Sequence, residues 1–381
     1  MPPRRYQLRK QAVSVVERGH PWVFRDQLSS AASVFRDGDW LRLVDGANRV
    51  IGHGIYEASG AIAIRVLRRG RDVPDAAWLR GQLVTALARR STLASETNAI
   101  RLINGESDGL PATVVDRFGD TLVGQSYSRG ADALTRFSAI ALARELAIPN
   151  VLLRPAVRRR SEPAAMRVLC GAPPTIGRFI EGGVTFHVDL ASGQKSGTYL
   201  DLRGLRRWVA SQSLAGKRVL NLFSYSGMLG RMAELAGASA ITQVDASERA
   251  LAFAAEHHVA DRARHTFICA DIFEWLPALD STELFDLVIV DPPAMTSDKS
   301  AVPRVLAAYR KLYRAAAPHV APGGALVAAC CTSRIDRAVF ERTLRDTLGD
   351  QLTREGSIAP EPDHPAAFRE ADYLKIICWR R

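Results

Sequence analysis

The sequence predicts an α/β protein whose C-terminal half forms a doubly wound, mostly parallel sheet. Three observations support this fold class. Short apolar runs recur between residues 218 and 379, each run is apolar almost throughout, and stretches with helical periodicity separate most of them. Strands covered by helices on both faces show this pattern. The runs are RVLNLF (218–223), AITQVD (240–245), TFICAD (266–271), LFDLVIVD (284–291), GALVAAC (324–330) and YLKIICW (373–379).

Residues 1–72 are predicted to form a small β-rich domain. Residues 37–57 alternate apolar and polar side chains between Asp-Gly and Gly-rich turns, and residues 61–70 continue as another strand. The arginine-rich stretch RRGRDVPDAA then indicates an exit linker.

Residues 73–175 are predicted to form a central α+β domain, and residues 176–381 the α/β domain. The expected elements of the central domain are a helix over 77–95, a segment of strand character over 110–128, a helix over 131–146 and a strand over 150–155.

Composition narrows the class of protein. The net charge is +11 with a pI near 9.8, which favours a polyanionic partner such as nucleic acid. However, only six of the 51 basic residues are lysines, so the excess could also reflect the amino-acid bias of a GC-rich genome. No apolar run is long enough to span a membrane, and the N-terminus lacks the apolar core of a signal peptide.

The five cysteines have no C-x-x-C spacing, which argues against a disulfide framework and a structural zinc site. This pattern fits a reducing cytoplasm, and no metal is expected. The cysteines are Cys170, Cys269, Cys330, Cys331 and Cys378.

The loop after the first run, NLFSYSGMLG, is expected to bind a ligand, because ligands of such sheets bind beyond the carboxyl ends of the strands. Only Gly227 falls in the tight turn, with Gly230 in the first turn of the helix, so the match to G-x-G-x-x-G is poor and a dinucleotide is disfavoured. A smaller ligand that touches the backbone here, such as S-adenosylmethionine, suits the loop better.

Two acidic residues end the next strands. Asp245 can accept hydrogen bonds from both hydroxyls of a ribose; the alternative is a helix cap, although Ser247 is better placed for capping. Asp271 can bind an adenine amino group while an apolar neighbour, Ile272 or Phe273, covers the ring, and a capping role is equally open.

Among these stretches, DLVIVDPPAM gives the most specific indication of the substrate. Pro292 and Pro293 cannot continue a helix, and they leave carbonyl groups free to face a substrate. Methyltransferases that act on amino groups of bases typically place a stacking aromatic residue after such prolines. Ala294 stands there, which makes amine chemistry less attractive.

Cys330 and Cys331 should point to opposite faces of the last parallel strand. Cys330 is predicted to pack in the core, as a small buried hydrophobe. Cys331, taken as the last strand residue, can reach a bound base, where its thiolate could add to carbon 6 of a cytosine and activate carbon 5. Packing or a chance thiol remains the alternative.

These motifs resemble those of the bacterial ribosomal RNA large-subunit cytosine-5 methyltransferases that carry an N-terminal PUA domain. The resemblance covers nearly the whole chain. It rests on HPWVF (20–24), GESDGLPATVVDRFG (105–119), VDLASGQKSGTYLDLR (188–203), LNLFSYSGM (220–228), VDAS (244–247), DPP (291–293), and DHP with YLK (363–365 and 373–375).

The resemblance implies a β-barrel-like PUA domain, a central domain and a Rossmann-like class I methyltransferase domain with a seven-stranded sheet. It implies Cys331 as nucleophile, Asp291 as a second catalytic residue that also lies at the cofactor, and Pro292, Pro293 and Ala294 at the base. The S-adenosylmethionine residues that it implies are Phe223, Ser224, Tyr225, Gly227, Asp245, Ala246, Ser247, Asp271, Ile272 and Asp291, with Lys195, Tyr199 and Arg203 towards the methionine end.

The implied function is formation of 5-methylcytosine in large-subunit (23S) ribosomal RNA, in the cytoplasm. A homodimer is one possible state, and the sequence does not give the oligomeric state. Ala294-Met295 replaces the family's usual Lys-Phe, and Cys330 replaces a serine, so the modified nucleotide is open. Two other functions remain: methylation of a base amino group without a covalent adduct, and RNA binding by a protein with a vestigial methyltransferase domain.

Overall fold

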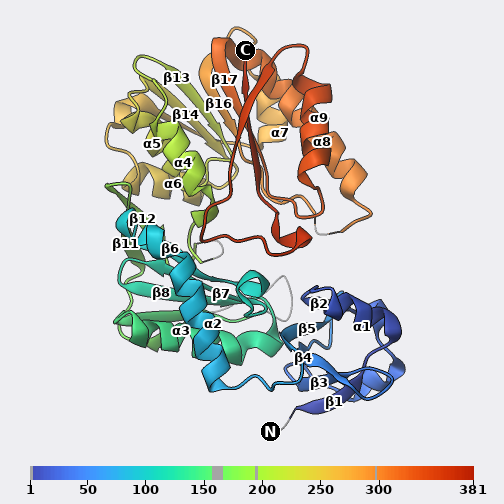
Figure 1. Ribbon diagram of the computed structural model, residues 1–381. Helices are drawn as coiled ribbons and strands as arrows, with labels where there is room; N and C mark the ends of the chain where they lie inside the picture. Colours follow the sequence, from blue (N-terminus) through green and yellow to red (C-terminus); the bar gives the residue numbers. More distant parts are fainter. Residues whose placement is uncertain (1–2, 157–165, 194–195, 297) are drawn as a thin grey trace. The chain divides into compact units, whose positions relative to one another are not determined.

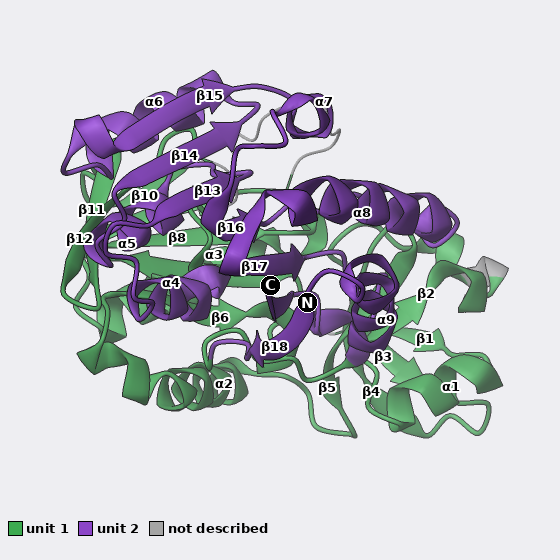
Figure 2. Ribbon diagram, turned by 90° about the horizontal axis from the view of Figure 1, so that it is seen from above, with its two compact units in different colours: residues 1–200, 362–368 green, residues 201–361, 369–381 purple. Residues whose placement is uncertain are grey.

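The chain folds into two units, which are described separately below. The computed structural model describes residues 3–156, 166–193, 196–296 and 298–381. Unit 1 comprises residues 1–200 and 362–368, and unit 2 comprises residues 201–361 and 369–381 (Figure 2). This division does not separate the first two predicted domains from each other, so the boundaries of the three domains stay a prediction.

The first sheet of unit 1 has five strands in the order β1-β3-β4-β5-β2. Its strands confirm the two stretches predicted over 37–57 and 61–70. The basic N-terminus holds a further strand and a helix that its short, charged pattern did not indicate. The elements are β1 (Arg4–Gln7), α1 (Lys10–Glu17), β2 (Trp22–Phe24), β3 (Trp40–Val44), β4 (Val50–Tyr56) and β5 (Ile62–Arg69).

The second sheet of unit 1 has the order β10-β9-β8-β7-β6, with α3 packed against β7, β8 and β9. The helix predicted over 77–95 ends at Arg89 and a separate 3₁₀ turn follows it. Its start is fixed by Asp75, whose side chain accepts a hydrogen bond from Trp78 N. The elements are α2 (Ala76–Arg89), β6 (Ala99–Asn104), β7 (Thr113–Phe118), β8 (Thr121–Ser126), α3 (Asp132–Glu145), β9 (Asn150–Arg154) and β10 (Arg167–Cys170).

The alternation of strand and helix predicted from about Thr175 begins only with α4 (Arg203–Ala210). Residues before it form an antiparallel pair, β11 (Ile176–Glu181) and β12 (Val184–Asp189), in unit 1. Gly182 and Gly183 make the turn between these strands with φ of 56° and 78°, a conformation that glycine adopts without steric cost.

Segments far apart in the sequence meet within unit 1. Trp22 Nε1 donates to the Glu106 carboxylate over 2.8 Å, and the Asp363 carboxylate accepts from Arg101 N over 3.0 Å. Asn104 Nδ2 donates to the Pro365 carbonyl over 3.1 Å. The HPW, GES and DHP stretches of the resemblance are therefore joined in this unit.

Unit 2 holds a seven-stranded sheet in the order β15-β14-β13-β16-β17-β19-β18. Figure 1 labels β13, β14, β16 and β17 of this sheet. The strands β13 to β17 pair in parallel, and β19 is antiparallel to both neighbours. This order confirms the predicted mostly parallel sheet. The strands are β13 (Arg218–Leu222), β14 (Ala240–Asp245), β15 (His265–Cys269), β16 (Phe285–Val290), β17 (Val320–Cys330), β18 (Thr353–Ile358) and β19 (Lys375–Arg380).

Helices cover both faces of this sheet. Figures 1 and 2 show α4 and α5 (Met228–Leu235) on one face and α8 (Val302–Ala316) and α9 (Arg337–Leu348) on the other. The core on the second face includes Tyr309, Tyr313 and Phe340, all fully buried. The remaining helices are α6 (Glu248–His257) and α7 (Ile272–Trp275).

Candidate functional site

The turn after β13 is held in an unusual backbone conformation. Phe223 and Tyr225 have φ of 59° and 45°, and Gly227, at the start of α5, has φ of 73°. Left-handed backbone is costly for residues with a side chain, and such residues concentrate at functional sites. A Cβ atom on Gly227 would lie 2.6 Å from the Ala254 Cβ, so the turn requires glycine for space as well as conformation.

The Asp245 carboxylate connects this turn to the end of β14. One oxygen accepts from Tyr225 N over 2.8 Å and the other from Ser247 N over 2.9 Å. Ser247 caps α6 by accepting from Ala250 N over 3.2 Å, so the capping role belongs to Ser247, as the sequence indicated. A carboxylate has further acceptor capacity, so ribose binding by Asp245 stays a prediction, as does the contact assigned to Ala246.

Asp271 caps α7 by accepting from Phe273 N over 2.8 Å, which confirms its capping role; its exposed carboxylate retains acceptor capacity for an adenine amino group. Ile272 is only 2% exposed and packs in the core. The half-buried neighbour is Phe273, whose ring lies 6.1 Å from that of Phe223 at an angle of 65°. The ring of Phe223, after β13, and the ring of Phe273, after β15, thus form an aromatic surface. The sequence implied Phe223 as a cofactor contact and offered Phe273 as one of two neighbours of Asp271 that could cover an adenine.

The Asp-Pro-Pro loop follows β16. Asp291 is half-buried, Pro292 is buried, and Pro293 and Ala294 are exposed. The Cys331 Sγ lies 3.5 Å from the Pro292 carbonyl oxygen, so the structure brings together the two stretches that the sequence singled out for substrate chemistry.

The adjacent cysteines have different surroundings. Cys330 is fully buried in the core, which confirms its predicted place, whereas Cys331 is half-buried. Cys331 was expected to be the last strand residue, and this detail is wrong. The β17 ladder ends with Cys330 opposite Lys375, and Cys331 is the first residue beyond it.

Lys375 supports the loop that follows Cys331. This side chain is 0% exposed, and its Nζ donates to the carbonyls of Thr332 over 3.0 Å and Ile335 over 2.7 Å. Burial lowers the pKa of Lys375, while the neighbouring thiol groups of Cys330 and Cys331 act in the opposite direction. The sequence motif contained Lys375, but no pattern in one sequence indicates which carbonyls a buried lysine will reach.

Two tyrosines of α8 also hold this strand end. The Tyr313 hydroxyl donates to the Ala329 carbonyl over 2.7 Å, and the Tyr309 hydroxyl lies 3.3 Å from the Thr332 Oγ1. Burial raises the pKa of both tyrosines far above the ordinary value, so both stay neutral.

Three residues were predicted to contact the methionine end of the cofactor: Lys195, Tyr199 and Arg203. Lys195 lies outside the described residues. Tyr199, half-buried, belongs to unit 1. Arg203 is 1% exposed and forms an ion pair with Glu361 over 3.1 Å, and Glu361 also pairs with Arg207 over 2.7 Å. A cofactor contact of these residues stays a prediction.

Buried polar atoms beside the turn fit a bound S-adenosylmethionine. Ser224 Oγ and Asn221 Oδ1 are buried and have no hydrogen-bond partner within the described part of the chain. Buried polar groups in native proteins are normally satisfied, so these atoms indicate a missing ligand or water. Together with the Asp245 carboxylate and the two phenylalanine rings, they offer polar contacts and ring faces of the kind that an adenosine group uses.

No cluster of three or more His, Cys, Asp or Glu side chains that could hold a metal ion occurs among the described residues. The helices in that same part of the chain are all too short or too polar to cross a membrane.

Comparisons with known proteins agree with this geometry. Residues 125–371 match the family model of S-adenosylmethionine-dependent methyltransferases, and residues 7–69 match that of a PUA-like domain. The crystal structure of a methyltransferase complexed with SAH superimposes with a TM-score of 0.85, over 99% of this chain and 100% of that one. Its 21% sequence identity supports the fold alone.

Two curated relatives extend the similarity over nearly the whole chain. A ribosomal RNA large subunit methyltransferase of Deinococcus radiodurans is 34% identical, over 99% of this chain and 97% of that protein. Ribosomal RNA large subunit methyltransferase I of Klebsiella pneumoniae is 31% identical, over 95% and 94% of the two chains.

The fold and the site therefore define a class I S-adenosylmethionine-dependent methyltransferase that carries a PUA-like domain. The chain belongs to the family of the ribosomal RNA large subunit methyltransferases. The resemblance, the fold class and the cofactor predicted from the sequence are confirmed.

Proposed function

We propose that the protein methylates carbon 5 of a cytosine in large-subunit ribosomal RNA, through a covalent bond between Cys331 and the base. The substrate class is supported by the names of the two relatives and by the PUA-like domain. The chemistry is supported by one observation above the others: a half-buried thiol stands 3.5 Å from the Pro292 carbonyl of the Asp-Pro-Pro loop.

Carbon 5 of cytosine is a poor nucleophile, and the Cys331 thiolate changes this. Addition of the sulfur to carbon 6 breaks the double bond between carbons 5 and 6 and places its electron pair on carbon 5. S-adenosylmethionine, when bound, supplies the electrophilic methyl group. Loss of the carbon-5 proton to a base then restores the double bond and expels the thiolate, so the enzyme is regenerated.

The described residues of unit 2 offer supporting roles in this reaction. Phe223 and Phe273 would contact the adenine, Asp245 the ribose, and Asp271 the adenine amino group. Carbonyl groups of the Asp-Pro-Pro loop would bind the cytosine amino group, since this loop lies outside the helices and strands. Asp291 would orient the base or assist proton transfer. The PUA-like domain would hold other parts of the RNA.

The adjacent cysteines supply a matched test. Cys331→Ala should abolish methylation, with a loss of at least about 10³-fold in turnover, because the carbon has no other route to activation. Cys330→Ala should keep the activity and lose only about 1 kcal/mol of folding stability, since it removes one small buried group. Methyl transfer is measured with labelled cofactor on ribosomal RNA, and the product nucleoside by mass spectrometry.

Retained activity in Cys331→Ala would contradict the proposal and indicate methylation of a base amino group instead. Absence of cofactor binding by the wild-type protein in calorimetry would indicate a vestigial methyltransferase domain. Neither alternative has an observation in its favour: Ala294 offers no ring for stacking, and the cofactor turn is intact.

A further inference from the structure

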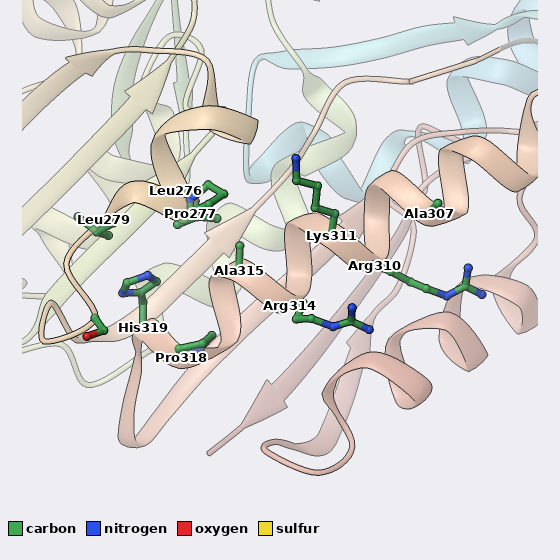
Figure 3. Close-up of a pocket in the computed structure, with 11 residues that line it drawn as sticks. Leu276, Pro277, Leu279, Ala307, Arg310, Lys311, Arg314, Ala315, Pro318 and His319 are labelled. Carbon is green, nitrogen blue, oxygen red and sulfur yellow. The ribbon is translucent and has the colours of Figure 1, made fainter.

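Unit 2 has a groove that the proposed reaction does not use. It is a cavity of about 610 Å³ between α8 and the two 3₁₀ turns Leu276–Ala278 (η8) and Ala317–His319 (η9) (Figure 3). Leu276, Pro277, Leu279 and Pro318 give it apolar walls.

Among the described residues that line this groove, the charged side chains are positive. Arg310, Lys311 and Arg314 line it from α8, and Figure 3 shows the two arginines extending from one side of the helix and Lys311 from the other. Helix α8 contains no acidic residue. Lys311 and Arg314 are exposed and Arg310 is half-buried, and the ion pairs found among the described residues involve none of the three.

No ion pair among the described residues joins the neighbouring acidic side chain, Asp280, to these three cations. Asp280 precedes the lining residue Ser281, and its carboxylate accepts from Thr282 N over 2.9 Å and from Thr282 Oγ1 over 2.8 Å. The lining residue His319 is 4% exposed, and its Nδ1 lies 2.8 Å from the Glu283 carbonyl oxygen. The groove is thus bordered by three cations, two on one side of α8 and one on the other, that take part in no ion pair among the described residues.

The groove is remote from the catalytic thiol. Residue Val320, directly after η9, begins β17, whereas Cys331 follows the other end of that strand. The pairing with β16 is irregular between Val320 and Ala325, so Cys330 lies about seven strand positions from Val320, which at ~3.3 Å each is on the order of 20 Å. A molecule bound beside η9 would therefore not be the target nucleotide.

We propose that this groove, lined by Arg310, Lys311 and Arg314, binds the phosphate backbone of a second segment of the substrate RNA. Arginine and lysine side chains are the usual phosphate contacts of nucleic-acid-binding proteins, and they fix position without reading sequence. Arg310 and Arg314 are one helical turn apart, about 6 Å along the axis, so both can contact one strand. The inference rests on the proposed RNA substrate and adds to it a contact distant from the site of methylation.

The test compares two triple variants that lose the same charge. Arg310→Gln/Lys311→Gln/Arg314→Gln removes the groove cations, and Arg136→Gln/Arg342→Gln/Arg345→Gln removes three exposed arginines on α3 and α9 as the control. The affinity for a transcript of large-subunit ribosomal RNA is measured, without cofactor, at salt concentrations from about 50 to 200 mM.

For the groove variant, the slope of log affinity against log salt should fall by about 2, because each lost phosphate contact removes roughly 0.7–0.9 from it. The turnover at saturating RNA should not change. A slope equal to that of the control variant would overturn the proposal. A change in the sedimentation of the RNA-free protein that occurs only in the groove variant would also overturn the proposal. Such a change would mean that the groove contacts a second copy of the protein.

Failure of the covalent mechanism would leave this test intact. The readout is RNA binding, which does not depend on the Cys331 thiol, so an active Cys331→Ala variant would remove the proposed chemistry without altering the predicted salt dependence. Loss of all RNA affinity in the wild-type protein would instead remove the substrate class itself.

Discussion

The ends of β13 and β17, where we propose the cofactor turn and the nucleophile, are held in place by different means. The turn after β13 is shaped by its own backbone, through left-handed residues and a hydrogen bond to Asp245 from the next strand. The loop after β17 is shaped by side chains from elsewhere: Lys375 from β19 and Tyr309 from α8. The comparison teaches that a cofactor turn can be recognised locally, whereas the surroundings of a nucleophile depend on the assembled fold.

The largest effect is expected at the β13 turn, from Gly227→Ala. Gly216 is the matched control, because its φ of 72° is close to the 73° of Gly227, but a Cβ atom on Gly216 would meet no other atom within 4 Å. The clash at position 227 adds to the strain of a left-handed alanine, so Gly227→Ala should lose about 2–4 kcal/mol of folding stability.

Gly216→Ala should lose only about 1 kcal/mol. Affinity for S-adenosylmethionine, measured by calorimetry, should fall at least about tenfold in Gly227→Ala and stay unchanged in Gly216→Ala. Equal losses of cofactor affinity in the two variants would contradict the prediction, because they would show that the close contact between Gly227 and Ala254 does not shape the cofactor site.

A second prediction concerns the β17 loop, through Lys375→Met. Removal of the ammonium leaves the carbonyls of Thr332 and Ile335 without its hydrogen bonds, which should lower the free energy of unfolding by about 2 kcal/mol. Lys217→Met, which breaks an exposed ion pair with Asp286, should change it by no more than about 0.5 kcal/mol.

Lys375→Met should also affect the thiol. A positive charge beside a thiol favours the thiolate, so alkylation of Cys331 by iodoacetamide, followed by peptide mass spectrometry, should require higher pH in the variant. If the alkylation profile does not move, Lys375 supports the loop mechanically and has no electrostatic part in activation.

The smallest expected effect is on the pH dependence of stability, and it comes from His265, beneath the β13 turn. Gln243 lies between His265 and Gly230 of α5. Gln243 Nε2 lies 3.0 Å from His265 Nδ1, and burial lowers the pKa of His265 below its ordinary value of 6.5. As the pH falls below 6.5, the unfolded chain binds a proton before the folded one, so the stability falls until the folded pKa is passed.

In acid, the free energy of unfolding should therefore fall by about 1.4 kcal/mol for each unit by which the pKa of His265 is lower in the folded than in the unfolded chain. His265→Asn should reduce that dependence, measured by urea unfolding between about pH 5 and 7. Burial also lowers the pKa of His53, in unit 1, so part of the dependence should remain in the variant. An unchanged slope would show that His265 is not the source.

Much of this organisation could be predicted from the sequence. The parallel strands were visible because both faces are buried, and the ligand loops because they follow those strands. Strand β18 was missed, since its sequence TREGSI is almost devoid of apolar residues. The hairpin β11–β12 was missed for a related reason: its half-exposed strands lack the apolar run that marked the parallel ones.

The candidate site was predictable to the extent that its chemistry is local. Asp245, Gly227 and Cys331 carry signals in their own neighbourhoods. Lys375 does not, because its partners lie about 40 residues earlier in the chain and its burial is decided by β17 and β19 together. Phe273 was visible as a neighbour of Asp271, but only the fold shows that Phe273 faces outward and Ile272 inward.

The most direct test of the covalent mechanism uses ribosomal RNA that contains 5-fluorocytidine in place of cytidine. Fluorine at carbon 5 cannot be removed as a proton, so the elimination step stops and the enzyme stays bound to the RNA. With S-adenosylmethionine present, we predict a denaturation-resistant complex in which the RNA is bonded to Cys331. Peptide mass spectrometry of the Cys330→Ala variant identifies the attachment site, because that variant has no second cysteine beside Cys331. Absence of such a complex, or attachment at any other residue, would contradict the account.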